Sequence, residues 1–565
     1  MHTMNDMRPS PRRSGVIFER SLRPPIAGEG GAYAHRLPIK PNITTGNDER
    51  FVQQQAQRQV SDVRRPMTDL GRNIRDLLLQ GSSVVVPAVA GSGKTSLALS
   101  VVQHLAPSQQ RATLFLAFNR EVIERLRPHV SLARMTTIHG LALRALGIMH
   151  PDLRVDGRKL HRIIESVIIR NRQHARLAHH IFDTEMSRKI LADDLHALAV
   201  RMITRQESAL MAAHVIRGHM TFPEMAATLV VDVISAMRDD PDTIALEEAV
   251  PWVLTKHVTL PCVRYVVVDE AQDLGPLDVE LVLRLVRQSG AHVLILGDEH
   301  QAIYGFRGAA GSAMSLLAAG VPGIVERPLT TSHRCPTEVA RLAQRLVSTF
   351  LPSPQAQTGS VTATAAAQWP QTSRALMTGD LVVCRTGAPL VPLAVHLQQT
   401  GMPVVIRATI GARLMSAVRR LLRGSSLPQS AWDAACRKRM EEAPIEQQDI
   451  FLALMALGAG MDHVTETTME QRWASLISET GAAVCFATIH QAKGMEADTV
   501  VWVGPERIGL DERMEAVEEQ HLVYVAITRA RRRLILQSLN ASVPDGDALM
   551  KRLLNVEHES SRAVA

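Results

Sequence analysis

Aromatic residues make up only 3% of this 565-residue chain, so a ring that stands inside a motif is less often incidental. Cysteine is also rare. Cys262, Cys335, Cys384, Cys436 and Cys485 lie far apart and form no C-x-x-C pair, so neither a disulfide framework nor a zinc site is expected. No apolar run is long enough for a membrane helix, and no secretory signal pattern opens the chain. These absences favour a cytoplasmic globular protein with no membrane partner.

The chain does have length and a modest positive charge. With 565 residues it is too long for a single core, so several domains are expected. Its 63 Lys and Arg against 56 Asp and Glu leave a net charge of +7, which favours a polyanionic partner but is shared by many enzymes. Residues 1–65 are rich in Pro, Gly, Arg and Gln and predict a disordered basic arm, which either is merely solvated or touches nucleic acid.

The strongest local motif is a glycine-rich loop. An apolar run precedes the sequence AVAGSGKT at residues 88–95, and an apolar helical pattern follows it. Gly91 and Gly93 let the backbone turn several N–H groups toward one anion at the start of a helix. This pattern predicts a phosphate-binding loop in which Lys94 would reach the β and γ phosphates and Thr95 would ligate Mg²⁺, although alanine replaces the first glycine of the usual pattern. The residues expected to bind the nucleotide are Ala90, Gly91, Ser92, Gly93, Lys94, Thr95 and Ser96.

Two adjacent acids end another strand-like run. The β-branched residues 265–268 lead into Asp269 and Glu270, which places both acids at the C-terminal edge of a parallel sheet, where α/β folds bind ligands. Asp269 is suited to hold Mg²⁺ through water, and Glu270 to orient or deprotonate the attacking water. For this pair taken alone, an acidic loop without function is the alternative. Residues 142–258 carry mostly helical patterns and predict an insertion into this sheet domain.

Six blocks, taken in order, resemble the UvrD/Rep group of superfamily 1 helicases. The first two are the phosphate-binding loop and the D-E-A-Q-D run, and later ones include T-T-S-H-R-C-P and V-Y-V-A-I-T-R-A. The blocks span residues 90–95, 269–273, 297–309, 329–336, 487–496 and 523–530. Their number and order make coincidence negligible.

The resemblance implies an α/β fold of two RecA-like parallel-sheet P-loop NTPase domains with helical insertions, and ATP in the cleft between the domains. The expected first RecA-like domain comprises residues 66–141 and 259–310, with the helical insertion at 142–258. The expected second domain comprises residues 311–410 and 480–545, with a small helical insertion at 411–479 and a C-terminal tail at 546–565.

The resemblance also implies roles for single residues. Gln301 would sense the γ phosphate, and Arg334 and Arg529 would reach it from the second domain when the cleft closes. For each arginine, a surface ion pair is the alternative. Glu496 matches the acid that holds the nucleotide ribose. Where relatives read adenine with a glutamine and a tyrosine, this chain has a glycine and His333, so a strict preference for ATP is not expected.

A single-stranded nucleic acid needs flat rings for its bases and cationic or polar groups for its phosphates. The candidates for this track, all in or near the matched blocks, are Phe118, Asn119, His139, Phe306 and His490. Each ring could instead belong to the core.

These features together predict an ATP-dependent and Mg²⁺-dependent translocase on single-stranded DNA, with RNA not excluded. The family resemblance implies a 3′–5′ DNA helicase acting in repair, recombination or replication. The alternative is a nucleic-acid-stimulated P-loop ATPase that serves a defence or repair complex as a switch without unwinding. A nuclease domain is not expected in the residues after Ala530.

Overall fold

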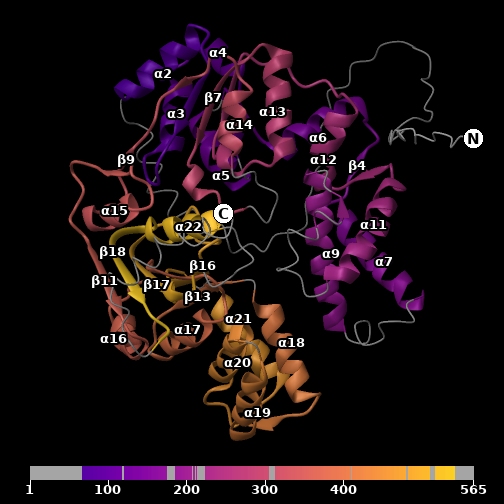
Figure 1. The fold of residues 1–565 in the computed structure, drawn as a ribbon, viewed down its shortest axis with the longest axis vertical. Helices are drawn as coiled ribbons and strands as arrows, with labels where there is room; N and C mark the ends of the chain where they lie inside the picture. Colours follow the sequence, from indigo (N-terminus) through magenta and orange to yellow (C-terminus); the bar gives the residue numbers. More distant parts are fainter. Residues whose placement is uncertain are drawn as a thin grey trace, which may run out of the picture. The chain divides into compact units, whose positions relative to one another are not determined.

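The computed structural model describes residues 67–540, with gaps at 118–119, 131, 175–184, 206–207, 210–211, 213–222, 305–311, 409, 444, 479–480 and 509–515. The predicted basic arm and C-terminal tail lie outside these residues. Two six-stranded sheets, both parallel, carry most of the strands, and helices flank them (Figure 1). This arrangement confirms the prediction of an α/β fold with two RecA-like domains.

The first sheet has its strands in the order β3-β2-β6-β7-β1-β8. They are β1 (Val84–Pro87), β2 (Thr113–Ala117), β3 (Arg134–Thr137), β6 (Tyr265–Val268), β7 (His292–Gly297) and β8 (Val325–Glu326). Most of their residues are apolar and buried, which is typical of a parallel sheet covered by helices on both faces. Because all the strands run in one direction, the residues that follow β1, β6 and β7 meet at one edge.

Helices cover both faces of this sheet, and we call the sheet with these helices the first lobe. The helices on one face are α2 (Asp69–Leu79), α3 (Lys94–Gln103) and α5 (Arg120–Leu126), and those on the other are α6 (Ile138–Met149), α12 (Ala249–Thr255), α13 (Pro276–Ser289) and α14 (Ala313–Ala319). Val84 and Val86 face the first group and Val85 the second, as the two-residue period of a strand requires. Since α14 and β8 both follow residue 310, this lobe continues past the predicted end of the first domain.

The second sheet has the order β11-β18-β17-β12-β16-β13. Its strands are β11 (Ser360–Thr364), β12 (Leu381–Cys384), β13 (Val404–Arg407), β16 (Val484–Thr488), β17 (Ala497–Val503) and β18 (Ala530–Gln537). One face packs against α15 (Thr337–Gln344) and α22 (Ala516–Ile527), and the other against α16 (Trp369–Arg374) and α17 (Leu390–Gln399). We call this sheet with its helices the second lobe.

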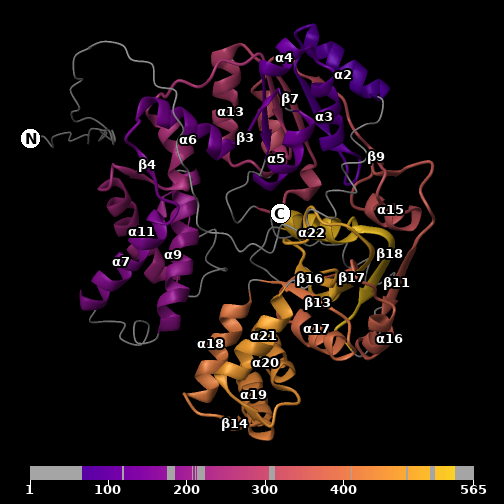
Figure 2. The ribbon, with the colours of Figure 1, turned by 180° about the vertical axis from the view of Figure 1, so that it is seen from behind.

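A helical insertion interrupts the first lobe between α6 and α12. Its main helices are α7 (Lys159–His174), α9 (Glu185–Arg205) and α11 (Pro223–Arg238), which lie side by side (Figure 2). Their buried apolar residues form a core of their own. At its base, β4 (Arg154–Val155) pairs with β5 (Thr243–Ile244). The fully buried Lys159 ammonium donates to Glu248 Oε2 at 3.0 Å and to the carbonyl oxygens of Asp240 and Thr243 at 3.0 and 2.8 Å. All three ammonium protons thus have acceptors, which is what allows this charge to be buried.

A smaller helical insertion follows β13 in the second lobe. It contains α18 (Gly411–Leu422), α19 (Gln429–Glu442), α20 (Ile445–Gly458) and α21 (Glu466–Ile477), and its buried Trp432 and Trp473 belong to the same apolar core as α17. Arg507, which follows β17, forms an ion pair with Asp449 of α20 and so ties the insertion to the sheet. Across the described ranges, none of the helices has both the length and the apolar character needed to cross a membrane.

Candidate nucleotide-binding site

The loop between β1 and α3 has the backbone of an anion cradle. Gly91 and Gly93 have φ values of +72° and +86°, in the left-handed region that favours glycine. Helix α3 begins at Lys94, and its N-cap residue, Gly93, has no side chain that could cap the first N–H groups. The Ser92 hydroxyl is buried and has no hydrogen-bond partner within the part of the chain that the structure describes. These open donors, beside the Lys94 ammonium, fit the phosphates of a nucleotide.

The two acids after β6 lie directly beside this loop. Thr95 Oγ1 donates to Asp269 Oδ2 at 2.7 Å, and the Glu270 amide donates to Asp269 Oδ1 at 3.0 Å. Glu270 adopts a left-handed φ of +53°, a conformation that an L residue rarely takes and that is found at functional sites. Gln272 Nε2 holds Glu270 Oε2 at 2.6 Å. A hydroxyl and a carboxylate in contact form the oxygen ligand set that suits Mg²⁺.

The pKa values of the two acids are shifted in opposite directions. Burial, and then repulsion from Glu270, raises the pKa of Asp269 to about 6. Burial also opposes ionisation of Glu270, but the positive charges of Lys94 and Lys493 outweigh it and hold the pKa of Glu270 at about 2. Glu270 is therefore an ionised acceptor at neutral pH. A divalent cation beside Thr95 and Asp269 would supply the charge that favours an ionised Asp269 as well.

A short turn after β7 connects the acids to the second lobe. We call residues 298–304 the sensor turn. Asp298 accepts hydrogen bonds from Gln301 Nε2 at 2.6 Å and, at its own amide, donates to Gln272 Oε1 at 3.0 Å. Gln272 thus binds Glu270 with its amide nitrogen and the sensor turn with its amide oxygen. The predicted catalytic acid Glu270 is therefore connected to the predicted γ-phosphate sensor Gln301 through two buried residues, Gln272 and Asp298.

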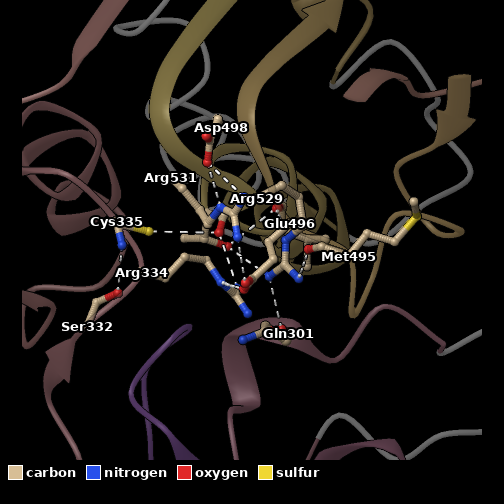
Figure 3. Close-up of polar contacts among 11 residues, drawn as sticks. Gln301, Ser332, Arg334, Cys335, Met495, Glu496, Asp498, Arg529 and Arg531 are labelled. Atoms are coloured by element: carbon tan, nitrogen blue, oxygen red, sulfur yellow. Dashed lines mark hydrogen bonds and ion pairs between the residues drawn. The ribbon is translucent and has the colours of Figure 1, made fainter. Parts of the chain in front are cut away.

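Arg529, just before the start of β18, reaches the sensor turn from the second lobe. Its side chain is 1% exposed and donates to the carbonyl oxygens of Val525 and Met495 at 2.9 and 3.3 Å and to Gln301 Oε1 at 3.3 Å (Figure 3). Burial, together with the nearby Arg334, lowers the pKa of Arg529 to about 10, so this guanidinium keeps its charge at neutral pH. The structure therefore brings Gln301 and Arg529 together.

Arg334, which is predicted to reach the site from the second domain, contacts both lobes. The preceding residue, His333, donates its amide to the Gly91 carbonyl at 2.9 Å, and a Cβ added to Gly91 would lie 2.5 Å from Arg334 Cβ. Arg334 thus lies against the phosphate-binding loop itself. Its Nε donates to Glu496 Oε2 at 2.6 Å (Figure 3), and this cation, against the opposing effect of burial, lowers the pKa of Glu496. The predicted ribose-binding acid is therefore paired with an arginine here.

Several polar residues at the contact between the lobes are not among the predicted site residues. Lys493 Nζ lies 2.6 and 2.7 Å from the two carboxylate oxygens of Asp273 and 2.6 Å from the Gln301 carbonyl oxygen. Tyr524 contacts both Ala90 and Asp298. All of these stand inside the matched blocks, which is the only signal the sequence offers. Their partners lie up to 434 positions away, and no local pattern encodes such pairs.

Two of the five candidates for the nucleic-acid track lie among the described residues. Phe118, Asn119 and Phe306 lie outside the described residues. His139 is half-buried in the first turn of α6 in the first lobe, and His490 is half-buried just after β16 in the second lobe. The His490 carbonyl accepts from Tyr304 Oη at 3.5 Å, so this segment also contacts the sensor turn.

Comparison with known proteins gives two matches to family sequence profiles. The AAA domain profile matches residues 72–307, and the profile of the UvrD-like helicase C-terminal domain matches residues 459–541. The first range covers most of the first lobe with its insertion, and the second contains β16, β17, α22 and β18.

Individual relatives match over parts of their length. F-box DNA helicase protein 1 of Schizosaccharomyces pombe is 27% identical over 311 residues, covering 48% of this chain and 33% of the relative. F-box DNA helicase 1 of Gallus gallus is 24% identical over 516 residues, covering 81% and 48%. The ATP-dependent DNA helicase Rep of Salmonella typhimurium is 34% identical over 86 residues, covering 15% and 13%. The chain thus spans less than half the length of each of these relatives.

Proposed function

The chain belongs to the UvrD/Rep-like group of superfamily 1 helicases, and we propose that it is an ATP-driven motor that moves along single-stranded DNA and separates strands. One observation carries the proposal. Arg529 of the second lobe donates at 3.3 Å to Gln301 of the first lobe, beside the phosphate-binding loop and the two acids. A site built from both lobes can convert the state of a nucleotide into a change in how the lobes contact each other.

The residues divide the chemistry of hydrolysis among them. Mg²⁺-ATP, when bound, supplies the electrophilic phosphorus and the leaving diphosphate. The loop amides and Lys94 would hold the β and γ phosphates, and Thr95 and Asp269 would hold the metal. Glu270, kept ionised by Lys94 and Lys493, would accept the proton of the attacking water. Gln301, Arg334 and Arg529 would surround the transferred group and stabilise its charge.

Several finer properties belong to this proposal and rest on the family. These are a 3′–5′ direction, a role in DNA repair, recombination or replication, and a nucleic-acid track that includes Phe118, Asn119, His139, Phe306 and His490. RNA is not excluded as a track. Ribose binding by Glu496 would require the nucleotide to compete with, or share, the ion pair to Arg334.

The test measures nucleotide hydrolysis with single-stranded DNA, duplex DNA and RNA side by side, and strand separation on duplexes with a 3′ or a 5′ tail. We expect single-stranded DNA to stimulate hydrolysis and the 3′-tailed duplex to be unwound. Lys94→Ala is the control and should lower turnover by at least about 100-fold, because the cation in the phosphate cradle is lost.

Two results would contradict the proposal. Turnover by Lys94→Ala within about tenfold of the natural protein would place hydrolysis at another site. Stimulation by single strands without any displacement of a duplex strand would favour the alternative, a switch subunit that hydrolyses ATP but does not unwind.

A further inference from the structure

The hydroxyl of Tyr524 lies between two functional parts of the first lobe. Tyr524 belongs to α22 of the second lobe and is 1% exposed. Its Oη accepts from the Ala90 amide of the phosphate-binding loop at 2.9 Å and donates to Asp298 Oδ2 of the sensor turn at 3.2 Å. One hydroxyl group thus uses both its donor and its acceptor capacity to connect the nucleotide cradle with the sensor turn.

The contacts continue from Asp298 to Arg529. The same Asp298 oxygen accepts from Gln301 Nε2 at 2.6 Å, and Gln301 Oε1 accepts from Arg529 Nη2 at 3.3 Å. Asp298 therefore orients the Gln301 amide so that its oxygen faces Arg529 (Figure 3 shows this last contact). All the groups from Ala90 to Arg529 along this relay are buried, where hydrogen bonds are stronger than in water and polarise each other.

Packing keeps the Tyr524 ring in this position. Phe350 and His300 contact it edge-on, with ring centroids 6.0 and 5.8 Å away. The Tyr524 carbonyl accepts from the amide and the hydroxyl of Thr528 at 3.1 and 2.7 Å. Tyr524 in the last turn of α22 and Arg529 just after it are thus linked, so a movement of α22 would displace both residues together.

We propose that the Tyr524 hydroxyl is a positioning group for nucleotide hydrolysis. The hydroxyl holds Asp298, Asp298 orients the amide of Gln301, and Gln301 in turn contacts the guanidinium of Arg529. Through its contact with the Ala90 amide, the same hydroxyl fixes the position of these three residues relative to the phosphate-binding loop. This inference rests on the proposed ATPase function. Tyr524 itself contacts no phosphate in this scheme and acts through Gln301.

The substitution Tyr524→Phe removes one oxygen and keeps the ring. We expect the affinity for a fluorescent ATP analogue to stay within about threefold, and kcat to fall by about tenfold or more both with and without single-stranded DNA. Tyr265→Phe is the matched control, since Tyr265 is a 2% exposed tyrosine of the first sheet whose hydroxyl has no hydrogen-bond partner in the described chain. It should leave kcat unchanged.

A double variant separates positioning from general damage. If Tyr524 acts through Gln301, adding Tyr524→Phe to Gln301→Ala should lower kcat by less than about twofold more, because the group that is positioned is already missing. A full multiplicative loss in the double variant would overturn the inference. So would an equal loss of kcat in Tyr265→Phe, which would indicate that any buried tyrosine hydroxyl affects turnover.

Hydrogen exchange gives a readout that needs no hydrolysis. In the nucleotide-free protein, the peptide over residues 88–97 should exchange faster in Tyr524→Phe than in the natural protein, because the Ala90 amide loses its acceptor, whereas Tyr265→Phe should show no change. Unchanged exchange, or faster exchange with unchanged kcat, would overturn the inference. Absence of any hydrolysis in the natural protein would instead contradict the proposed function, and the exchange experiment would still decide whether the contact exists.

Discussion

The two lobes hold their charged groups at the site in different ways. The first lobe supplies backbone amides, the Lys94 ammonium and two carboxylates, those of Asp269 and Glu270, which follow directly after a buried strand. The second lobe supplies Arg529 and Lys493, and both bind carbonyl or carboxylate oxygens in the structure. The two acids are held by groups of their own lobe, whereas each of the two cations also contacts the other lobe, Lys493 at Asp273 and Arg529 at Gln301. The difference predicts that a change to an acid affects chemistry alone, while a change to a buried cation affects chemistry and stability together.

The sharpest test on the side of the acids is Glu270→Gln. The amide cannot accept a proton from water, so hydrolysis should fall by about 10²–10⁴-fold, while nucleotide affinity and the melting temperature stay close to those of the natural protein. Glu280→Gln on α13, an exposed residue that pairs with Arg287, is the control and should behave as the natural protein does. Normal turnover in Glu270→Gln would show that another group accepts the proton.

On the side of the cations, Arg529→Lys keeps the charge but loses the planar fork. We expect kcat to fall by at least about tenfold and the free energy of unfolding to drop by about 1–3 kcal/mol, because the carbonyl oxygens of Val525 and Met495 lose their donors. Calorimetry and turnover would measure the two effects. The exposed Arg532→Lys is the control. A variant with reduced turnover and unchanged stability would remove the contrast between the two lobes.

Gly91→Ala tests the close contact between the phosphate-binding loop and Arg334. The left-handed φ and the collision with Arg334 Cβ at 2.5 Å should cost about 1–3 kcal/mol of stability and raise KM for the nucleotide. Gly379→Ala separates strain from collision, since Gly379 has a φ of +93° but nothing lies within 4 Å of its added Cβ. If both variants lose the same stability and neither changes KM, Arg334 does not limit the space in the loop.

The smallest expected effect is a pH dependence of the lobe contact. His521 of α22 lies with Nδ1 2.9 Å from the Ala302 carbonyl oxygen. Burial, with His300 and Lys493 nearby and against the opposing pull of Asp298, lowers the pKa of His521 below its ordinary value of 6.5. The unfolded chain therefore takes up the proton first, so the stability that neutral His521 contributes is present above pH 6.5 and is lost as the pH falls below it.

Melting temperatures between about pH 7.5 and about pH 5.5 would check this sign. His521→Asn, which keeps an N–H donor but cannot titrate, should reduce the loss of stability on acidification. His463→Asn, at an exposed position, should not change it. An identical pH profile for the natural protein and His521→Asn would exclude His521 as the titrating group.

The sequence reveals the first lobe of the site more fully than the second. A strand, a glycine-rich loop and a helix follow each other in residues 84–103, so the loop can be predicted from neighbours alone, and the same holds for the acids after β6. The α/β class follows from the same strand and helix patterns. The roles of the individual residues remain proposals.

Contacts between the lobes could not be predicted in this way. Lys493 and Asp273 are 220 positions apart, and Arg334 and Glu496 are 162 positions apart. The residues next to each of these side chains in the sequence therefore give no sign of its partner. The prediction also ended the first domain at residue 310, because β8 is only two residues long and gives no periodic signal. The order of the strands and the packing of α14 show that the chain stays with the first lobe until after that strand.

The hydrogen bonds of the segment after β8 bear on the order in which Arg334 and Arg529 would reach a bound nucleotide. The Leu329 amide donates to the Pro87 carbonyl, and the Leu329 carbonyl accepts from the Val89 amide. The His333 amide donates to the Gly91 carbonyl, so the backbone that carries Arg334 is hydrogen-bonded along the phosphate-binding loop. The Arg334 side chain donates to Glu496 Oε2 at 2.6 Å and to the Thr528 carbonyl oxygen at 3.3 Å, so both contacts would have to break before it could turn to a phosphate in the role that we propose. Arg529 belongs to the second lobe and contacts the first at Gln301, so this contact depends on the two lobes being together. In the proposed mechanism, Arg334 would lie beside the loop when a nucleotide binds, whereas Arg529 would reach the nucleotide only while the lobes are in contact.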